Sequence, residues 1–170
     1  MRLSKIIDDK RSSLVILLIF HLLYRFFLLS IDAFPFNSDE AIVGLMAKHI
    51  LEGDSFLYFY GQSYMGSLDA YLVALGFLLF GQSVVVIRLV QVFLYGLMII
   101  FAFLFLNNAF GNTKLAFFSA VFLVFAPVNV ILYTTVSLGG YGEALLLGVL
   151  SFYIAEKISP ENLNAKLGFW

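Results

Sequence analysis

The sequence predicts an all-α fold, a polytopic bundle of about four transmembrane helices with an external loop that bears amphipathic juxtamembrane helices. Hydrophobic residues make up 62% of the 170 positions and charged residues only 12%, too few to cover a water-soluble domain of this size. The apolar runs are long and do not alternate with polar residues, as barrel strands would. The chain has no cysteine, which excludes disulfides and cysteine-ligated metals, and no basic cluster that would indicate nucleic acid.

Four segments have roughly the 20 apolar residues that a helix needs to cross a bilayer. The first, residues 13–31, follows the charged stretch MRLSKIIDDKRSS. No small-residue cleavage site comes after it, so we expect a retained anchor and not a signal peptide. The other spans are expected at residues 84–106, 115–135 and 141–158, the third of them kinked at Pro127.

Lysine and arginine residues set the expected orientation. Residues 1–12 carry four of them and are expected in the cytoplasm. With four spans, residues 159–170 also lie inside, and we expect them to form a loop and the start of a further helix, as in an N-terminal fragment of a longer protein. Such a fragment is expected to be inactive by itself. Residues 32–83 then form an acidic loop on the outer face of the inner (plasma) membrane. Within it, residues 66–80 are apolar but short for a span and are expected at the interface; counted as a fifth span, they would reverse the side of every later loop.

The outer loop begins with SDEAIVGLMAKHILEG, which predicts a helix over residues 38–52 with Ser38 as its N-cap. Asp39 precedes Ile42 by three positions and is expected on the apolar, inward face, whereas Glu40 is rotated about 100° away. The positive end of the helix dipole favours ionised Asp39, the state that a general base requires. The alternative interpretation is that these acids only cap and solubilise the start of a helix.

The next segment, DSFLYFYGQSYMGSLDAY, mixes tyrosines with small and polar residues. Tyrosine combines a flat apolar ring with a polar tip. Tyr60 and Tyr64, together with Gln62 and Asp69, therefore suit the hydroxyl groups of a sugar. An interfacial belt of aromatic side chains is the alternative interpretation.

Several other polar residues are expected at membrane level. Arg25 and Arg88 lie near the outer ends of their spans, where they can snorkel to the surface or neutralise a phosphate. Glu143 is expected on the same side of the membrane as Asp39, so that two carboxylates face one cavity. His21 lies deeper and is expected to pack between helices as a neutral ring, not to bind a metal.

These signals occur in an order that resembles membrane glycosyltransferases with the GT-C fold, in particular bacterial relatives of the protein O-mannosyltransferases and of the lipid A aminoarabinose transferase. The resemblance spans nearly the whole chain and about the first third of a typical member. It rests on an arginine in the first span and on six later stretches, SDEAIVGLMAKHILEG, FYGQSYMGSLDAY, LGFLLFGQS, VIRLVQ, LGGYGEALLLG and LGFW.

The resemblance implies a catalytic role for Asp39 as the base, with Glu40 beside it and Glu143 as the acid of the second outer segment. It implies an inverting transfer of a sugar from a polyprenyl-phosphate donor to a hydroxyl of an extracytoplasmic lipid, glycan or protein acceptor. Arg25 and Arg88 would bind the phosphate. No cofactor is expected, although members of the family differ in their use of a divalent metal. The alternative is a non-catalytic membrane protein, a transporter fragment or an assembly partner.

Overall fold

The computed structural model describes residues 3–158 and is almost entirely helical. The predicted all-α class is therefore confirmed, apart from one short β-hairpin in the outer loop. The expected features of residues 1–2 and of the loop at 159–170 lie outside the described residues. The elements, in chain order, are α1 (Leu3–Asp8), α2 (Lys10–Ser30), α3 (Ser38–Leu51), β1 (Tyr58–Phe59), β2 (Gln62–Gly66), α4 (Leu68–Phe80), α5 (Val84–Phe110), α6 (Thr113–Val124), α7 (Val128–Tyr133) and α8 (Tyr141–Ile158).

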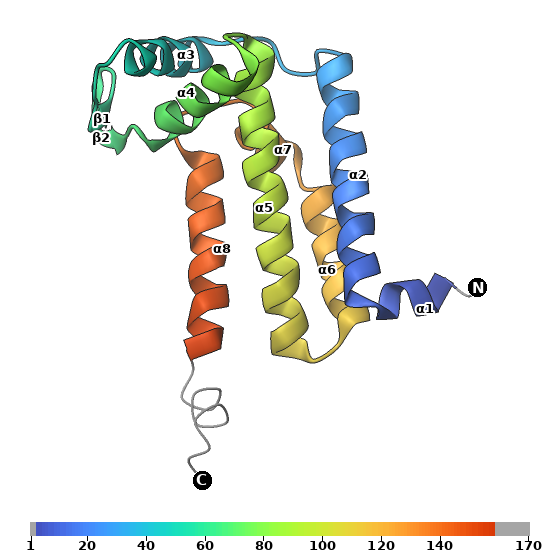
Figure 1. The fold of residues 1–170 in the computed structure, drawn as a ribbon. Coiled ribbons are helices and arrows are strands. Elements are labelled where there is room, and N and C mark those ends of the chain that lie inside the picture. Colours follow the sequence, from blue (N-terminus) through green and yellow to red (C-terminus); the bar gives the residue numbers. More distant parts are fainter. Residues whose placement is uncertain (1–2, 159–170) are drawn as a thin grey trace.

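The long helices run side by side, and the connecting elements gather at their two ends (Figure 1). One end, called here the loop end, holds α3, the hairpin and α4, beside the last turn of α2 and the first turns of α5 and α8. The opposite end, called the α1 end, holds α1, the turn from α5 to α6, and the last turn of α8. α3, which carries Asp39, and the start of α8, which carries Glu143, therefore both lie at the loop end.

Two of the described helices are long and apolar enough to cross a membrane, α2 with 21 residues and α5 with 27. Their shared core also includes α6. Many large apolar side chains on the outer surfaces of α2 and α5 are exposed, for example Leu23, Phe27 and Phe93. The fully buried centre of this core contains Leu17, Tyr95, Ile99, Phe103, Ala116, Ala120 and Val124.

Two helices, and not one, occupy the expected span at residues 115–135. α6 ends at Val124, and α7 begins after Pro127, which has no N–H to donate and whose ring clashes with the carbonyl four residues earlier. The Leu123 carbonyl at the end of α6 accepts a hydrogen bond of 2.7 Å from the Tyr95 hydroxyl. The proline thus produces a full break where the sequence predicts a kink, and α6 alone has only 12 residues.

A second core lies at the loop end, where α3 packs on α4 and on the start of α5. The side chains of α3 that it buries are Glu40, Val43, Met46 and Ala47. This corrects the predicted helix phase, which placed Glu40 on the outer face. The N-cap is also shifted by one residue, because Asn37 Oδ1 accepts hydrogen bonds from the backbone N–H groups of residues 39 and 40.

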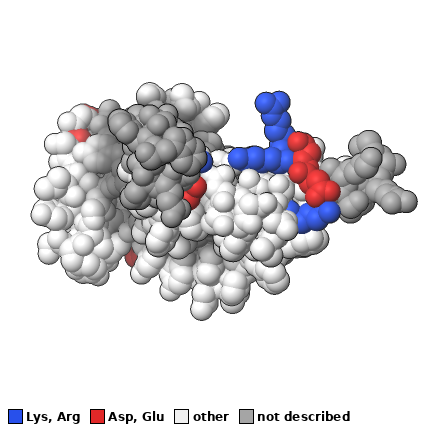
Figure 2. Space-filling view, turned by 90° about the horizontal axis from the view of Figure 1, so that it is seen from below, with Lys and Arg blue, Asp and Glu red and all other residues white. Residues whose placement is uncertain are grey.

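The α1 end carries charged side chains of both signs, gathered on one part of the surface in view, while most of the rest is uncharged (Figure 2). One ion pair joins Lys114 Nζ of α6 to Asp8 Oδ1 of α1 at 3.1 Å. Lys10 and Arg11 begin α2, and Lys157 lies in the last turn of α8, at the same end. The sequence-based orientation places this end in the cytoplasm, and that orientation stays a prediction.

Candidate functional site

A pocket of about 330 Å³ opens at the loop end, between α3, the hairpin, α7 and the start of α8. Three of the sequence-predicted site residues line it: Asp39, Gln62 and Tyr64. The other lining residues were not predicted: Phe59, Met65, Tyr133, Leu138 and Tyr141. The pocket is thus built from three separate stretches of the sequence, at Asp39, residues 59–65 and residues 133–141, and an acid, an amide and three tyrosines share its wall.

Asp39 is the acid of this pocket. It lies in the first turn of α3, half-buried, with its backbone N–H 2.9 Å from Asn37 Oδ1. No hydrogen bond or ion pair to the Asp39 carboxylate is formed by any side chain within residues 3–158. The N-cap therefore fixes the backbone at this position while the carboxylate oxygens stay available to a ligand.

Tyrosine rings form much of the remaining wall. The rings of Tyr133, the last residue of α7, and Tyr141, the first of α8, lie with centroids 4.7 Å apart and planes tilted by 38°. Tyr64 projects from β2 and is largely exposed. Apolar ring faces beside an acid and an amide suit the mixed surface of a sugar. Tyr141 lies inside the LGGYGEALLLG stretch, which was the available sequence signal for it.

The loop at residues 134–140, which contributes Leu138 to the pocket, depends on glycine. Gly139 and Gly140 have φ angles of +85° and +107°, which side chains with a Cβ rarely adopt. A Cβ on Gly139 would also collide with the Met65 side chain of the hairpin. The loop therefore approaches β2 closely, and this contact brings α8 beside the hairpin.

The predicted substrate residue Tyr60 does not line the pocket. It lies at the turn between β1 and β2, and its hydroxyl is 2.7 Å from His49 Nδ1 of α3. The Phe56 ring packs edge-on against it, with centroids 4.8 Å apart. Tyr60 therefore joins the hairpin to α3, which explains how so short a hairpin is held in place.

Glu40, adjacent to Asp39, forms a buried ion pair. Its two carboxylate oxygens each accept a hydrogen bond of 2.9 Å, one from Arg88 Nε and one from Arg88 Nη2. Asp32 lies 3.5 Å from Arg88 Nη1 at the surface. Both predicted roles change as a result: Glu40 anchors α3 to α5, and the Arg88 guanidinium is engaged by two carboxylates of this chain.

Arg25 is fully buried, so the expectation that it snorkels to the surface is wrong. Its guanidinium donates to the Ile131 carbonyl at 2.8 Å and to the Thr134 hydroxyl at 2.7 Å, and it also contacts the Thr135 hydroxyl. It stacks 4.6 Å from the centre of the Tyr95 ring. Arg25 thus holds α7, and with it Tyr133, against α2 and α5. His21, one turn earlier, packs between helices as predicted, with Nε2 3.0 Å from the Val92 carbonyl.

Replacing Arg25 by lysine should loosen α7. Lysine keeps the charge but loses the planar fork that reaches several acceptors at once, and a hydrogen bond from a charged group contributes about 1.5–3 kcal/mol. We expect a loss of stability of about 2 kcal/mol and faster amide hydrogen exchange in residues 128–135. Arg11→Lys, on the exposed start of the same helix, is the matched control. Equal exchange in the two variants would contradict this role.

Asp69 and Glu143 lie in a polar cluster separate from the lining of the pocket. Asp69 Oδ1 accepts a hydrogen bond of 2.8 Å from Gln91 Nε2, and Oδ2 accepts one from the Ser137 hydroxyl. Burial, and then the charge of Glu143, raise the pKa of Asp69 to about 8. The expectation that Glu143 faces the same cavity as Asp39 is therefore corrected: Glu143 pairs with Asp69, while Tyr141, two residues earlier, reaches the pocket.

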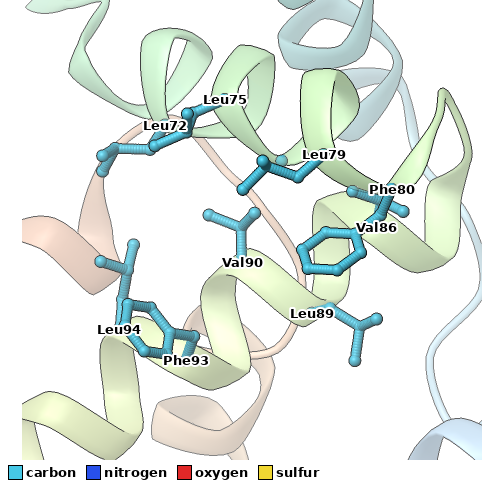
Figure 3. A pocket seen from close by; sticks show the side chains of 10 residues that line it. Leu72, Leu75, Leu79, Phe80, Val86, Leu89, Val90, Phe93 and Leu94 are labelled. Carbon is cyan, nitrogen blue, oxygen red and sulfur yellow. The ribbon is translucent and has the colours of Figure 1, made fainter.

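A second hollow of about 520 Å³ lies between α4 and α5 and is apolar throughout. Leu72, Leu75 and Leu79 of α4 point across it toward Val90, Phe93 and Leu94 of α5 (Figure 3). Gly76 lets the two helices approach, because a Cβ there would lie 2.8 Å from Val90 Cγ2. Such a surface suits a hydrocarbon chain.

The loop end therefore offers an open pocket that contains an acid, and α4 and α5 enclose a separate apolar groove. Comparisons of the chain with protein-family models, with curated proteins and with solved structures found no match. Within residues 3–158 no group of three or more His, Cys, Asp or Glu side chains is arranged to hold a metal ion. Asp39 can accept a proton, and the tyrosines and Gln62 can orient a hydroxylated ring.

Proposed function

We propose that the chain forms the N-terminal part of an inverting membrane glycosyltransferase that moves a sugar from a polyprenyl-phosphate donor to an extracytoplasmic hydroxyl. The observation that carries the proposal is the pocket in which Asp39, whose carboxylate binds no side chain of residues 3–158, lies with Gln62, Tyr64 and Tyr141. The resemblance of the ordered sequence stretches to GT-C glycosyltransferases supports the same reading. The proposal includes four membrane-spanning segments, with the loop end on the extracytoplasmic side and the N-terminus in the cytoplasm.

In this mechanism the acceptor hydroxyl enters the pocket and gives its proton to the Asp39 carboxylate. The hydroxyl oxygen forms a bond to the anomeric carbon from the face opposite the phosphate, and the bond from that carbon to the phosphate oxygen breaks. The lipid phosphate leaves with the electron pair, and the anomeric configuration is inverted. General base catalysis of this kind contributes about 10²–10⁴-fold to a rate.

The groove between α4 and α5 supports a lipid-linked donor. It lies in the apolar part of the chain, is lined by leucine, valine and phenylalanine, and offers no polar group to a headgroup. We propose that it holds part of the polyprenyl chain. Arg88 is a less suitable partner for the phosphate than the sequence predicts, because Glu40 already neutralises it.

The direct test uses the full-length protein of which this chain is the proposed N-terminal part, because the chain alone is expected to be inactive. It is supplied in nanodiscs with a polyprenyl-phosphate sugar labelled in the sugar and an extract of envelope acceptors. We expect label in an acceptor together with release of polyprenyl phosphate. A sugar linked to a nucleotide should give no transfer, because it has no chain for the groove. Donor binding without any transfer would instead favour the alternative, a non-catalytic partner of a membrane assembly.

A further inference from the structure

A cluster outside the Asp39 pocket joins four elements through polar side chains. Its members are Asp69 of α4, Gln91 of α5, Ser137 in the segment between α7 and α8, and Glu143 of α8. All four are at least 95% buried. Since polar groups are expensive to bury without partners, each of these side chains needs a hydrogen-bonding role inside the cluster.

Glu143 lacks such a role as long as both acids are ionised. Its two carboxylate oxygens are buried and have no hydrogen-bond donor among the described residues. The group that acts on it is the Asp69 carboxyl, which already accepts hydrogen bonds from Gln91 and Ser137. Two carboxylates thus face each other, and each has only acceptor atoms to offer the other.

Cations within the described residues 3–158 do not neutralise this pair. On the elements packed against α4, the buried charged groups are Glu40 of α3 and Arg88 of α5, and these bind each other. From α8 the charged group that faces Asp69 is Glu143 itself, while Gln91 and Ser137 are neutral. Two interacting carboxylates in a buried site repel each other strongly, so one carboxyl takes up a proton.

We propose that Asp69 and Glu143 form a proton-binding site, in which one shared proton bridges the two carboxyl groups and fastens α4 to the start of α8. The proton converts one acid into a donor and satisfies an oxygen of Glu143 that otherwise has no partner. The raised pKa of Asp69, about 8, agrees with this assignment. The site goes beyond the proposed transferase activity and does not depend on it.

The proton-binding site is connected to the pocket through the chain. Leu138 follows Ser137, and Tyr141 precedes Glu143 by two residues, and both line the pocket that contains Asp39. Loss of the proton leaves two buried negative charges, whose repulsion acts on residues 137–143. We therefore expect the shape of the pocket to depend on pH through this pair.

Infrared difference spectroscopy on the purified chain in nanodiscs tests the shared proton. We expect a protonated-carboxyl C=O band at neutral pH that is lost with a midpoint near pH 8. The band should vanish in both Asp69→Asn and Glu143→Gln, which keep the shapes of the side chains. Asp39→Asn is the control that should retain it. A wild-type spectrum without the band, or a band that survives in Glu143→Gln, would overturn the proposal.

Thermal unfolding gives a second readout that needs only the wild-type chain and one variant. Because the folded-state pKa of Asp69 is raised from 3.8 to about 8, the folded state binds more protons than the unfolded state in this window. The contribution of this pair to stability is therefore fully present below about pH 4, falls as the pH rises toward 8 and is lost above it. Glu143→Gln should flatten this slope. A melting temperature raised by added Na⁺ or Ca²⁺, with no carboxyl band, would show that a metal cation occupies the site and would refute the proton.

Discussion

Asp39→Asn should lower the turnover number for sugar transfer by about 10²–10⁴-fold, the usual contribution of a general base. Asparagine has nearly the same shape but cannot take the proton of the acceptor hydroxyl. The helix should still form, since its N-cap is the side chain of Asn37, and loss of one acid from the first turn changes stability by only about 0.3–1 kcal/mol. Initial rates at saturating donor measure the effect.

The matched control for this substitution is Asp54→Asn, which removes an exposed acid of the same outer loop that does not line the pocket. It should leave the turnover number within a factor of about two, because surface substitutions rarely change stability by more than about 0.5 kcal/mol. Since a base acts in the transition state, Asp39→Asn should change turnover more than donor affinity. Equal turnover in the two variants would remove Asp39 from the mechanism.

The positions of the helices could be predicted because hydropathy and capping are local properties. The segments expected at residues 38–52, 84–106 and 141–158 correspond to α3, α5 and α8. Asp39, Gln62 and Tyr64 were identified in the same way, as polar residues in a loop beside a membrane. The helices α2, α5, α6 and α8 run in alternating directions along the chain. The loop that follows α2 and the start of α8 therefore lie at the same end.

The pairing of buried charges could not be predicted, because the partners are distant in the sequence. Arg88 lies 48 positions from Glu40, and the backbone carbonyl that Arg25 binds lies 106 positions away. When the buried face of α3 is predicted from its apolar residues alone, Glu40 is placed on the exposed face. The buried face instead includes Glu40, because Arg88 supplies the charge that makes its burial tolerable. The hairpin was missed for a related reason: β1 has two residues, and contacts with α3 hold it in place.

Arg88→Met should lower the free energy of unfolding by about 3–5 kcal/mol, the typical result of removing one partner of a buried ion pair. The Glu40 side chain is fully buried, and both of its oxygens would lose their donor. Asp32→Asn removes the other acid that contacts the same guanidinium. Because 82% of the Asp32 side chain is exposed, that change should amount to no more than about 1 kcal/mol. Chemical denaturation in detergent micelles compares the two variants.

The double variant Glu40→Leu/Arg88→Met separates the loss of the pair from the loss of the arginine. Replacing both members by apolar residues leaves no unpaired charge, and such exchanges are often neutral or stabilising by about 1–4 kcal/mol. We expect the double variant to recover most of the stability that Arg88→Met loses. A double variant as unstable as Arg88→Met would mean that the arginine makes its contribution elsewhere, and the assigned partnership would be wrong.

The same double variant decides between the two roles proposed for Arg88. If Arg88 only anchors α3, restoring the packing restores the position of Asp39, the neighbour of Glu40, and transfer should return along with stability. If Arg88 also binds the departing phosphate, stability should return while transfer stays low. Since the guanidinium already donates two hydrogen bonds of 2.9 Å to Glu40, we expect the first result. The leaving phosphate would then be neutralised by groups other than Arg88.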